Sequence, residues 1–184
     1  MKELSDYRGP ILPKIDFSDF SKEKLVSLLK MYAKLYVAID GFWYMTVMDR
    51  NGNDEALACD IQAWKIMSKY EKKRIGETLR IQGNDILSFI KTLQISPWFI
   101  LTGYTVDMES NNSAILTVTH CPTLEALEKE GSGRQKQICS VFETEIFRNY
   151  ASLFNPNIET KPLTPLPRIS KDDVCCKWSF KLKQ

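Results

Sequence analysis

The sequence contains no long apolar run, and this argues against a membrane-spanning helix. None of its segments approaches the roughly 18 consecutive apolar residues that such a helix needs. Residues 1–17 carry charges and prolines where a signal peptide has an apolar stretch. An excess of one charge is missing too, because 25 basic residues nearly balance 23 acidic ones. We therefore expect a cytoplasmic protein with no membrane partner and, lacking a basic patch, no nucleic-acid partner.

Histidine and closely spaced cysteine pairs are also scarce. The chain has one histidine, His120, and five cysteines, and no cysteines are spaced as C-x-x-C. Secreted disulfide frameworks usually carry an even number of cysteines, so the odd count favours a reducing compartment.

What the chain does have is the composition of a soluble domain. Of its 184 residues, 43% are hydrophobic and 26% are charged, which predicts one folded domain rather than disorder. Pro10 and Pro13 rule out a continuous helix at the start, so we expect residues 1–20 to form an extended arm and residues 21–184 a single domain. The apolar residues of the arm need cover, from the body or from a partner subunit in a homodimer.

The periodicity of apolar residues changes along the chain from helical to strand-like. Ser21 is a plausible cap for a helix that Gly41 breaks or bends, and Asn53 for a second helix. The segment "SNNS" separates two strands of a hairpin, and a proline-rich edge segment and "DVCCKWSFKL" follow later. The order predicts an α+β fold with N-terminal helices packed on an antiparallel, about four-stranded sheet with ββ-α(α)-ββ order in the C-terminal half. Helices are expected at 22–48, 54–79, 84–94, 122–133 and 136–154, and extended segments at 98–110, 113–121, 157–169 and 173–182.

Three separated motifs carry a family resemblance. They are "IDGFWYMTVMDRNGNDEALACDIQAWKIMSKYEKKRI", "THCPTLEALEKEG…QICSVFE" and "DDVCCKWSF". Together they resemble an uncharacterised family, a prokaryotic domain of unknown function found in archaea and bacteria, with Asp-Gly-x-Trp and Cys-Lys-Trp-x-Phe motifs, over about residues 30–182. The resemblance places Cys121, Cys139 and Cys176 on the family's cysteine positions. Family members often have a fourth cysteine where this chain has "KPLTPLP", so a four-thiolate metal site is less expected here.

Two remoter resemblances concern the fold. The order of elements is similar to that of four-vinyl-reductase domains, which implies a small or lipid-like ligand held between helices and sheet. The size and cysteine placement resemble the aminothiazoline-carboxylate hydrolases. Both are analogies of fold, and fold alone does not establish function.

The last strand raises the question of two adjacent cysteines. Strand alternation places Cys176 on the apolar face with Trp178, and Cys175 on the opposite face, towards solvent or the edge of the strand. A disulfide between neighbours would be strained, so the simplest interpretation is that Cys176 fills the core as a small hydrophobe.

A metal site is one alternative for these side chains. Thiolate and imidazole ligands suit zinc or another borderline metal, and Glu143, four residues after Cys139 on one helix face, could act as base for a bound water. The ligands would be His120, Cys121, Cys139 and Cys176.

A nucleophilic thiolate is a second alternative. His120 would activate Cys139 or Cys121, and Glu143 would orient the imidazole, which gives a catalytic set of Cys139, His120 and Glu143 for hydrolysis of a small amide or amidine.

Aromatic residues define a third candidate, an apolar ligand cavity. Trp43 and Trp64 could line it, Asp40 would need a partner or a raised pKa if buried, and Cys121 and Cys176 could complete the lining. Plain helix packing would explain the same aromatics. Our leading hypothesis is a small-ligand-binding or sensor-like domain with a Cys/His-lined pocket. The alternatives are a thiol- or metal-dependent hydrolase and a purely structural oligomer.

Overall fold

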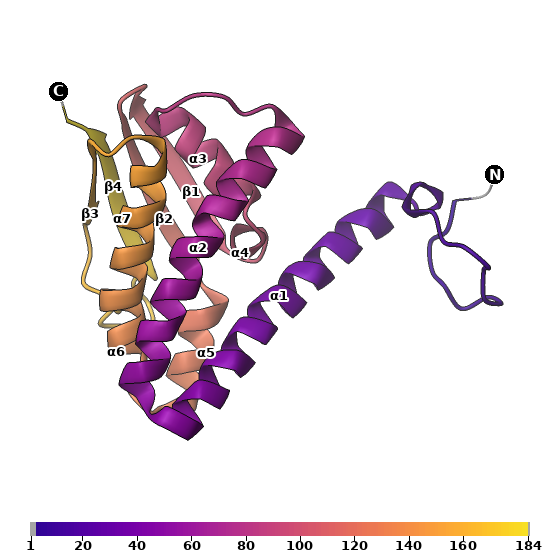
Figure 1. Ribbon diagram of the computed structural model, residues 1–184, viewed down its shortest axis with the longest axis horizontal. Helices are drawn as coiled ribbons and strands as arrows, with labels where there is room; N and C mark the ends of the chain where they lie inside the picture. The colour runs from indigo at the N-terminus through magenta and orange to yellow at the C-terminus, as the bar shows by residue number, and fades with distance from the viewer. Residues whose placement is uncertain (1–2, 184) are drawn as a thin grey trace.

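Helices fill the N-terminal half of the chain, and the C-terminal half combines a four-stranded sheet with further helices between its second and third strands (Figure 1). The computed structural model describes residues 3–183. This order confirms the predicted α+β class. The elements are a 3-10 turn (Phe17–Asp19), α1 (Lys22–Asn51), α2 (Asn53–Leu79), α3 (Ile86–Ile95), α4 (Pro97–Ile100), β1 (Gly103–Ser110), β2 (Ser113–His120), α5 (Pro122–Glu130), α6 (Gln135–Gln137), a π-helical turn (Ile138–Phe142), α7 (Glu143–Phe154), β3 (Ile158–Pro162) and β4 (Cys176–Leu182).

The sheet is antiparallel throughout, in the order β1-β2-β4-β3. The last strand is therefore central, and the short β3, which begins the proline-rich segment, lies at an edge as predicted. In the β2–β4 register, Leu116 is paired with Trp178 and Ala114 with Phe180. All four side chains are fully buried, so one face of the sheet forms the floor of the core.

Helices α3 and α7 supply the other side of this core. The ring of Phe89 in α3 lies 4.9 Å from that of Phe180, and the ring of Phe147 in α7 lies 5.0 Å from that of Trp178. Each is an edge-on or tilted contact of the kind that aromatic rings prefer. The alternation of apolar residues along β2 and β4 is thus explained by helices that cover a single face.

The first helix is longer and straighter than the sequence suggests. Ser21 caps it as predicted, accepting a hydrogen bond from the Lys24 amide at 3.3 Å. The predicted break at Gly41 is wrong, since α1 continues through it to Asn51. A glycine inside a helix costs about 1 kcal/mol, and contacts of Asp40 and Tyr44 with the body on either side offset it. No helix within residues 3–183 is both long and apolar enough to cross a bilayer.

The turn between α1 and α2 also differs in detail from the prediction. Gly52, with φ of 89°, occupies the cap position, and Asn53 already begins α2. The Asn53 side chain is used elsewhere, because its Oδ1 accepts a hydrogen bond from the Tyr44 hydroxyl at 2.8 Å. A positive φ favours glycine, which explains the choice of cap.

The N-terminal arm folds back on the start of α1 rather than across the body. Leu4 forms a bridge with Phe20, and its amide donates to the Asp19 carbonyl at 2.7 Å. Figure 1 shows the arm at the far end of α1, away from the sheet. Of the two expected covers for the arm, the body of its own subunit does not supply one, and cover by a partner subunit stays a prediction.

Candidate functional site

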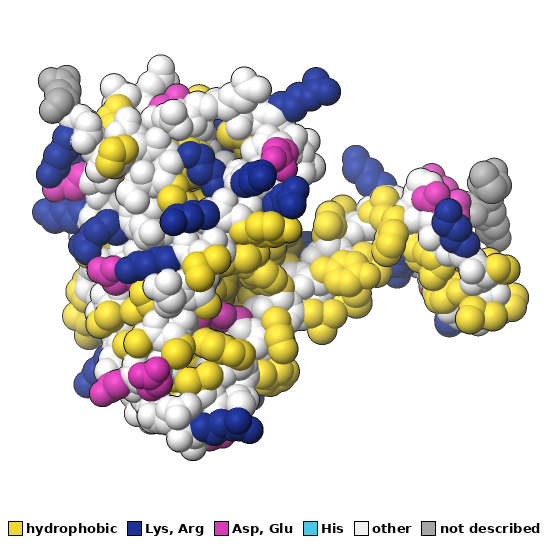
Figure 2. Space-filling view, viewed as in Figure 1, with side chains coloured by type: hydrophobic (Ala, Val, Ile, Leu, Met, Phe, Trp, Pro, Cys, Tyr) yellow, Lys and Arg dark blue, Asp and Glu magenta, His cyan; other side chains and the backbone are white. Residues whose placement is uncertain are grey.

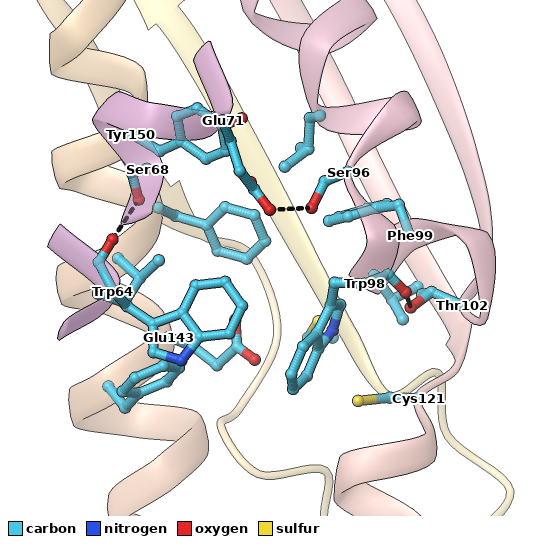
Figure 3. Close-up of a pocket in the computed structure, with 16 residues that line it drawn as sticks. Trp64, Ser68, Glu71, Ser96, Trp98, Phe99, Thr102, Cys121, Glu143 and Tyr150 are labelled. Carbon is cyan, nitrogen blue, oxygen red and sulfur yellow. Dashed lines mark hydrogen bonds between the residues drawn. The ribbon is translucent and has the colours of Figure 1, made fainter. Parts of the chain in front are cut away.

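A small apolar cavity lies between the helices and the sheet. Its volume is about 60 Å³, and it is enclosed by side chains from α2, α4, α7 and the paired strands β2 and β4 (Figure 3). We call it the inner cavity. Its lining consists of Trp64, Ser68, Glu71, Leu93, Ser96, Trp98, Phe99, Thr102, Val118, Cys121, Phe142, Glu143, Ile146, Phe147, Tyr150 and Cys176.

Glu143 is the most unusual group in this lining. Its carboxyl points into the cavity between Trp64 and Trp98 (Figure 3). It has no hydrogen-bond partner among residues 3–183, and its side chain is half-buried. Burial away from bulk water raises the pKa of this carboxyl to about 7. Glu143 can therefore hold or release a proton near neutral pH.

Local backbone geometry places Glu143 there. It is the first residue of α7, directly after the π-helical turn that carries Cys139. Such turns inside helices are rare and are common at functional sites. The sequence prediction that Cys139 and Glu143 face one region holds, because both border a second void of about 20 Å³ beside the inner cavity.

A second acid, Glu71 of α2, also lines the inner cavity. Unlike Glu143 it is partnered, because its carboxyl accepts hydrogen bonds from the hydroxyls of Tyr36 at 3.2 Å and Ser96 at 3.3 Å. The Tyr150 hydroxyl is near the same carboxyl but does not complete a hydrogen bond. Burial raises the pKa of Glu71, and the hydroxyl donors partly oppose this.

Four cysteines gather on the sheet side of the cavity. Cys121 and Cys176 line the inner cavity, and Cys139 and Cys175 join them around the small void. The prediction that Cys175 faces solvent is wrong: it is only 2% exposed, because it precedes β4 in an irregular segment to which strand alternation does not apply. All five cysteines of the chain are free thiols.

These thiols are poor nucleophiles in the folded protein. Burial raises the pKa of Cys121 to about 12, and burial together with the charge of Glu143 raises the pKa of Cys139 and Cys176 further. The Cys121 sulfur caps α5 by accepting the Leu124 amide at 3.4 Å. A thiol needs a lowered pKa to react quickly at neutral pH, and these have the opposite shift.

A larger cleft lies on the other side of the Trp98 and Phe142 side chains, which line both spaces. We call it the outer cleft. It measures about 300 Å³, is mainly apolar, and lies between α1, α2, α4, α5 and the turn before α7. Three carboxyl residues line it: Asp40 of α1, Asp60 of α2, and Glu130 of α5, which forms an ion pair with Arg134.

Asp40 and Asp60 form an acidic pair in the outer cleft. Asp60 is 4% exposed, and one of its oxygens, Oδ1, has no hydrogen-bond partner within residues 3–183. Burial and then the negative charge of Asp40 raise the pKa of Asp60 to about 8. Burial likewise raises the pKa of Asp40, although a hydrogen bond from Trp64 opposes the rise. Because the two buried carboxyls disfavour each other's negative charge, the pair keeps one proton at neutral pH.

Of the residues predicted from sequence to bind a ligand, the structure brings Trp64, Cys121 and Cys176 to the inner cavity and Asp40 to the outer cleft. Trp43 is not with them. Its side chain is 40% exposed on α1 and lines neither space.

The structure also separates His120 from the thiols of the predicted catalytic and metal sets. Its ring is half exposed at the last position of β2, and Nδ1 lies 2.7 Å from the Glu125 carboxylate of α5. Within residues 3–183, no three His, Cys, Asp or Glu side chains are arranged to share a metal ion. The arrangement of these side chains therefore does not support the predicted zinc site. Cys139 has no histidine beside it, and the pKa of its thiol is raised rather than lowered.

Sequence reasoning missed Glu71, Trp98, Cys175 and Asp60. The signal for the two acids is present, because Leu57, Asp60, Trp64, Ser68 and Glu71 recur at helical spacing and share one face of α2. Acids within a stripe that also holds a leucine and a tryptophan indicate buried carboxyls. Trp98 and Cys175 lie in a short helix and an irregular segment, where periodicity carries no information.

Comparison with known proteins gives one match. The model of a family of unknown function, DUF6125, matches residues 18–182. No curated protein and no solved structure matches the chain. The resemblances to four-vinyl-reductase domains and aminothiazoline-carboxylate hydrolases thus stay predictions.

Proposed function

The chain belongs to the DUF6125 family, and we propose that its domain binds a small, largely apolar ligand in the inner cavity, with the carboxyl of Glu143 as the polar anchor. The proposal keeps the ligand-binding function expected from the sequence. It retains Trp64 and Cys176 as contacts and adds Glu143 and Trp98. Trp64, Trp98 and Cys176 would contact the apolar body of the ligand.

The observation that carries this proposal is the carboxyl of Glu143, which faces an apolar cavity without a hydrogen-bond partner among the described residues. A buried polar group without a partner costs about 1–3 kcal/mol, and more when it is charged. A ligand that donates a hydrogen bond would remove this cost. The hydrogen bond would then contribute to affinity and orient the ligand.

The volume limits the size of the ligand. About 60 Å³ holds a few water molecules, and since an apolar cavity of roughly 150 Å³ binds benzene, a five-membered ring fits only with a small outward shift of the cavity walls. A longer ligand would have to move Trp98 or Phe142 and extend into the outer cleft, where Asp40 and Asp60 supply the polar groups. In a sensor, this movement would be the step that reports binding.

No specific observation favours the alternative of a hydrolase. An activated thiolate needs a base beside it and a lowered pKa, whereas His120 is paired with Glu125 and the pKa values of the cavity thiols are raised. A water-activating metal needs several converging ligands, which the described side chains do not provide.

A pair of matched probes tests the anchor. Pyrrole and furan are five-membered rings of nearly equal size, but only pyrrole donates a hydrogen bond. At about pH 8, where Glu143 with its pKa of about 7 is mostly ionised, we expect pyrrole to bind roughly tenfold more tightly than furan, since a hydrogen bond to a charged acceptor contributes about 1.5–3 kcal/mol. Ligand-detected NMR and the fluorescence of Trp64 and Trp98 would report the two affinities. Glu143→Leu should abolish the preference while leaving furan bound.

A filled cavity provides the second arm of the test. Ile146→Phe adds a ring at the cavity wall, whereas Ile66→Phe makes the same change on the exposed side of α2. Only the first should abolish binding of both probes. Equal affinities for pyrrole and furan in the wild type, or binding that survives Ile146→Phe, would refute the proposal. Native mass spectrometry of the untreated protein would show whether a resident ligand is already present.

A further inference from the structure

The first helix presents apolar residues on a side that its own subunit leaves uncovered. Tyr32 is 51% exposed, Leu35 57%, Ile39 64% and Phe42 60%. With Leu25 and Leu28 these residues are spaced alternately by three and four positions. We call the set Leu25, Leu28, Tyr32, Leu35, Ile39 and Phe42 the outer stripe.

The spacing of the outer stripe is that of a helix–helix seam. Alternation of three and four gives a period of 3.5 residues, which keeps one stripe facing a partner helix over successive turns. A helix packed only on its own domain follows 3.6 residues per turn, with one face apolar and the opposite face polar. In α1 the body-facing side is already supplied by other residues, such as Ala33 and Tyr44, which are 2% and 4% exposed.

The positions that flank the outer stripe carry no charge between Leu29 and Met45. They are occupied by Leu29, Met31, Tyr36, Ala38, Trp43 and Met45. The exposed charges of this part of α1, Lys30 and Lys34, lie on another side of the helix. Two identical stripes can therefore approach without like-charge repulsion.

The shape of the molecule leaves room for a partner. Figure 1 shows α1 leaving the body at an angle, so that its N-terminal part has no element of the domain beside it. In Figure 2 apolar side chains run along this part of the helix and onto the arm. Such a large apolar patch is rare on a monomeric protein and usually marks an interaction site.

We propose that the outer stripe pairs with the outer stripe of a second copy of this chain, so that α1 packs against α1 in a two-fold symmetric dimer. The stripe is self-complementary, as a two-fold interface requires. Seam-flanking charges usually select a different partner helix, and their absence here favours an identical one.

The area available is sufficient for a stable dimer. Eight large hydrophobic side chains of the outer stripe and its flanks are each 39% or more exposed: Leu29, Met31, Tyr32, Leu35, Ile39, Phe42, Trp43 and Met45. At roughly 90 Å² of exposed surface each, they amount to roughly 700 Å² per subunit, close to the roughly 800 Å² of a standard specific interface.

A membrane surface fits the same helix less well. Helices that lie on membranes have a strongly charged face opposite the apolar one. Between Leu25 and Met45, α1 has only Lys30, Lys34 and the half-buried Asp40, which is hydrogen-bonded to Trp64 inside its own subunit.

The dimer also bears on the outer cleft. Phe42 belongs to the outer stripe and to the lining of the cleft, together with Ala38 and Met45. A second α1 seated on the stripe therefore lies at the rim of the cleft and narrows its opening. This inference does not rest on the ligand proposed for the inner cavity.

The test is the mass of the full-length chain in solution. Light scattering after gel filtration should give twice the 21.2 kDa of one chain, and serial dilution should dissociate the dimer reversibly. Leu35→Glu combined with Ile39→Glu places four charges in the seam and should weaken the dimer by at least about 100-fold. The matched control, Lys30→Glu combined with Lys34→Glu, changes the charge on another side of the same helix and should leave the dimer intact.

Circular dichroism establishes that each variant is folded, and the outcomes then decide. A wild-type protein that is monomeric at about 100 µM, where even a weak interface would associate, overturns the inference. A Leu35→Glu, Ile39→Glu variant that dimerises as tightly as the wild type also overturns it. Flotation with vesicles of phosphatidylcholine and phosphatidylserine is the remaining arm, and a monomer that binds them through the stripe assigns the surface to lipid instead.

Discussion

The indole Nε1–H of Trp64 donates a hydrogen bond to Asp40 Oδ1 at 2.8 Å, and so connects the two spaces of the domain. The ring of Trp64 lines the inner cavity, while Asp40 faces the outer cleft. Three aromatic rings surround the indole edge-on: Tyr36 at 5.8 Å, Trp98 at 5.7 Å and Phe142 at 6.3 Å. Trp64 therefore fixes α1 to α2 with one polar and several apolar contacts.

Replacing Trp64 should destabilise the protein and also change the titration of Asp40. In Trp64→Phe the carboxyl loses its indole donor, which stabilises the ionised form, so the pKa of Asp40 should rise further. We expect a loss of about 2–4 kcal/mol in the free energy of unfolding at neutral pH, from lost packing and a lost hydrogen bond. Urea unfolding followed by circular dichroism measures it.

Trp43→Phe provides the matched control for this experiment. Trp43 is 40% exposed and lines neither cavity, so its replacement should change the free energy of unfolding by less than about 1 kcal/mol. A Trp64 variant as stable as the control would show that the hydrogen bond and the ring contacts do not hold α1 on the body.

Glu143→Gln should flatten the pH dependence of stability. The pKa of Glu143 is raised from an ordinary 4.5 to about 7, so the folded protein holds a proton that the unfolded chain releases. The contribution of this proton is complete below about pH 4.5, and stability falls as the pH rises toward 7, by about 3 kcal/mol in total. Glutamine cannot titrate, so the variant should lose this part of the slope.

The control for Glu143→Gln is Glu77→Gln, at an exposed ion pair with Arg74. Exposed pairs contribute little, so its pH profile should follow the wild type. Chemical unfolding at a series of pH values between about 4 and 8 gives all three curves, whose slopes count the protons bound on folding. An unchanged slope in Glu143→Gln would mean that water reaches the cavity and solvates this carboxyl.

Asp60→Asn should act in the same direction over a wider pH range. The pKa of Asp60 is raised from an ordinary 3.8 to about 8 by burial and by Asp40, so the folded protein keeps a proton that the unfolded chain releases, and its stability falls as the pH rises from about 4 to about 8. Asparagine resembles the protonated acid in shape, so we expect near-wild-type stability at about pH 4 and a gain of about 3–5 kcal/mol at about pH 8. Thermal unfolding at the two pH values tests this, with the exposed Asp107→Asn as the control. A variant less stable than the wild type at both would indicate that the pair is used as two carboxylates.

The fold was largely predictable because the spacing of apolar residues identifies most of its helices and strands. Leu116 and Val118 in β2, or Trp178 and Phe180 in β4, alternate as a half-buried strand must, and the helices repeat at three and four residues. The errors fall where local preference is overridden. Gly41 stays helical because the contacts of Asp40 and Tyr44 hold α1 on either side of it. Asn53 does not cap α2 because its side chain accepts a hydrogen bond from Tyr44 instead.

The candidate site was predictable only in part, for a different physical reason. Period tells which residues point inward, and it placed Cys176 and Trp64 on apolar faces that line the inner cavity. It did not do so for Cys121, which follows β2 as the cap of α5 and was singled out by the family resemblance. It does not tell which buried groups find partners, and this distinguishes Glu143 from Glu71. Nor could it separate His120 from the thiols, since His120 is the last residue of β2 and its ring turns to Glu125.

The reactivity of the cysteines provides the last prediction. Cys59 lines neither space, and its thiol donates to the Glu55 carboxylate at 3.6 Å near the surface, whereas the other four thiols border the inner cavity or the small void. The pKa of all five thiols is raised, in Cys59 by desolvation and by Glu55, so Cys59 differs from the others in its access to reagent and not in the direction of its pKa shift. In the native protein at about pH 8 we expect one thiol to react readily with a disulfide reagent, and Cys59→Ser to remove this phase. The remaining four should then react only as fast as the protein opens, with rates that rise in urea. A fast phase that persists in Cys59→Ser, and disappears on replacing Cys139 or Cys121, would instead revive the nucleophilic thiolate predicted from the sequence.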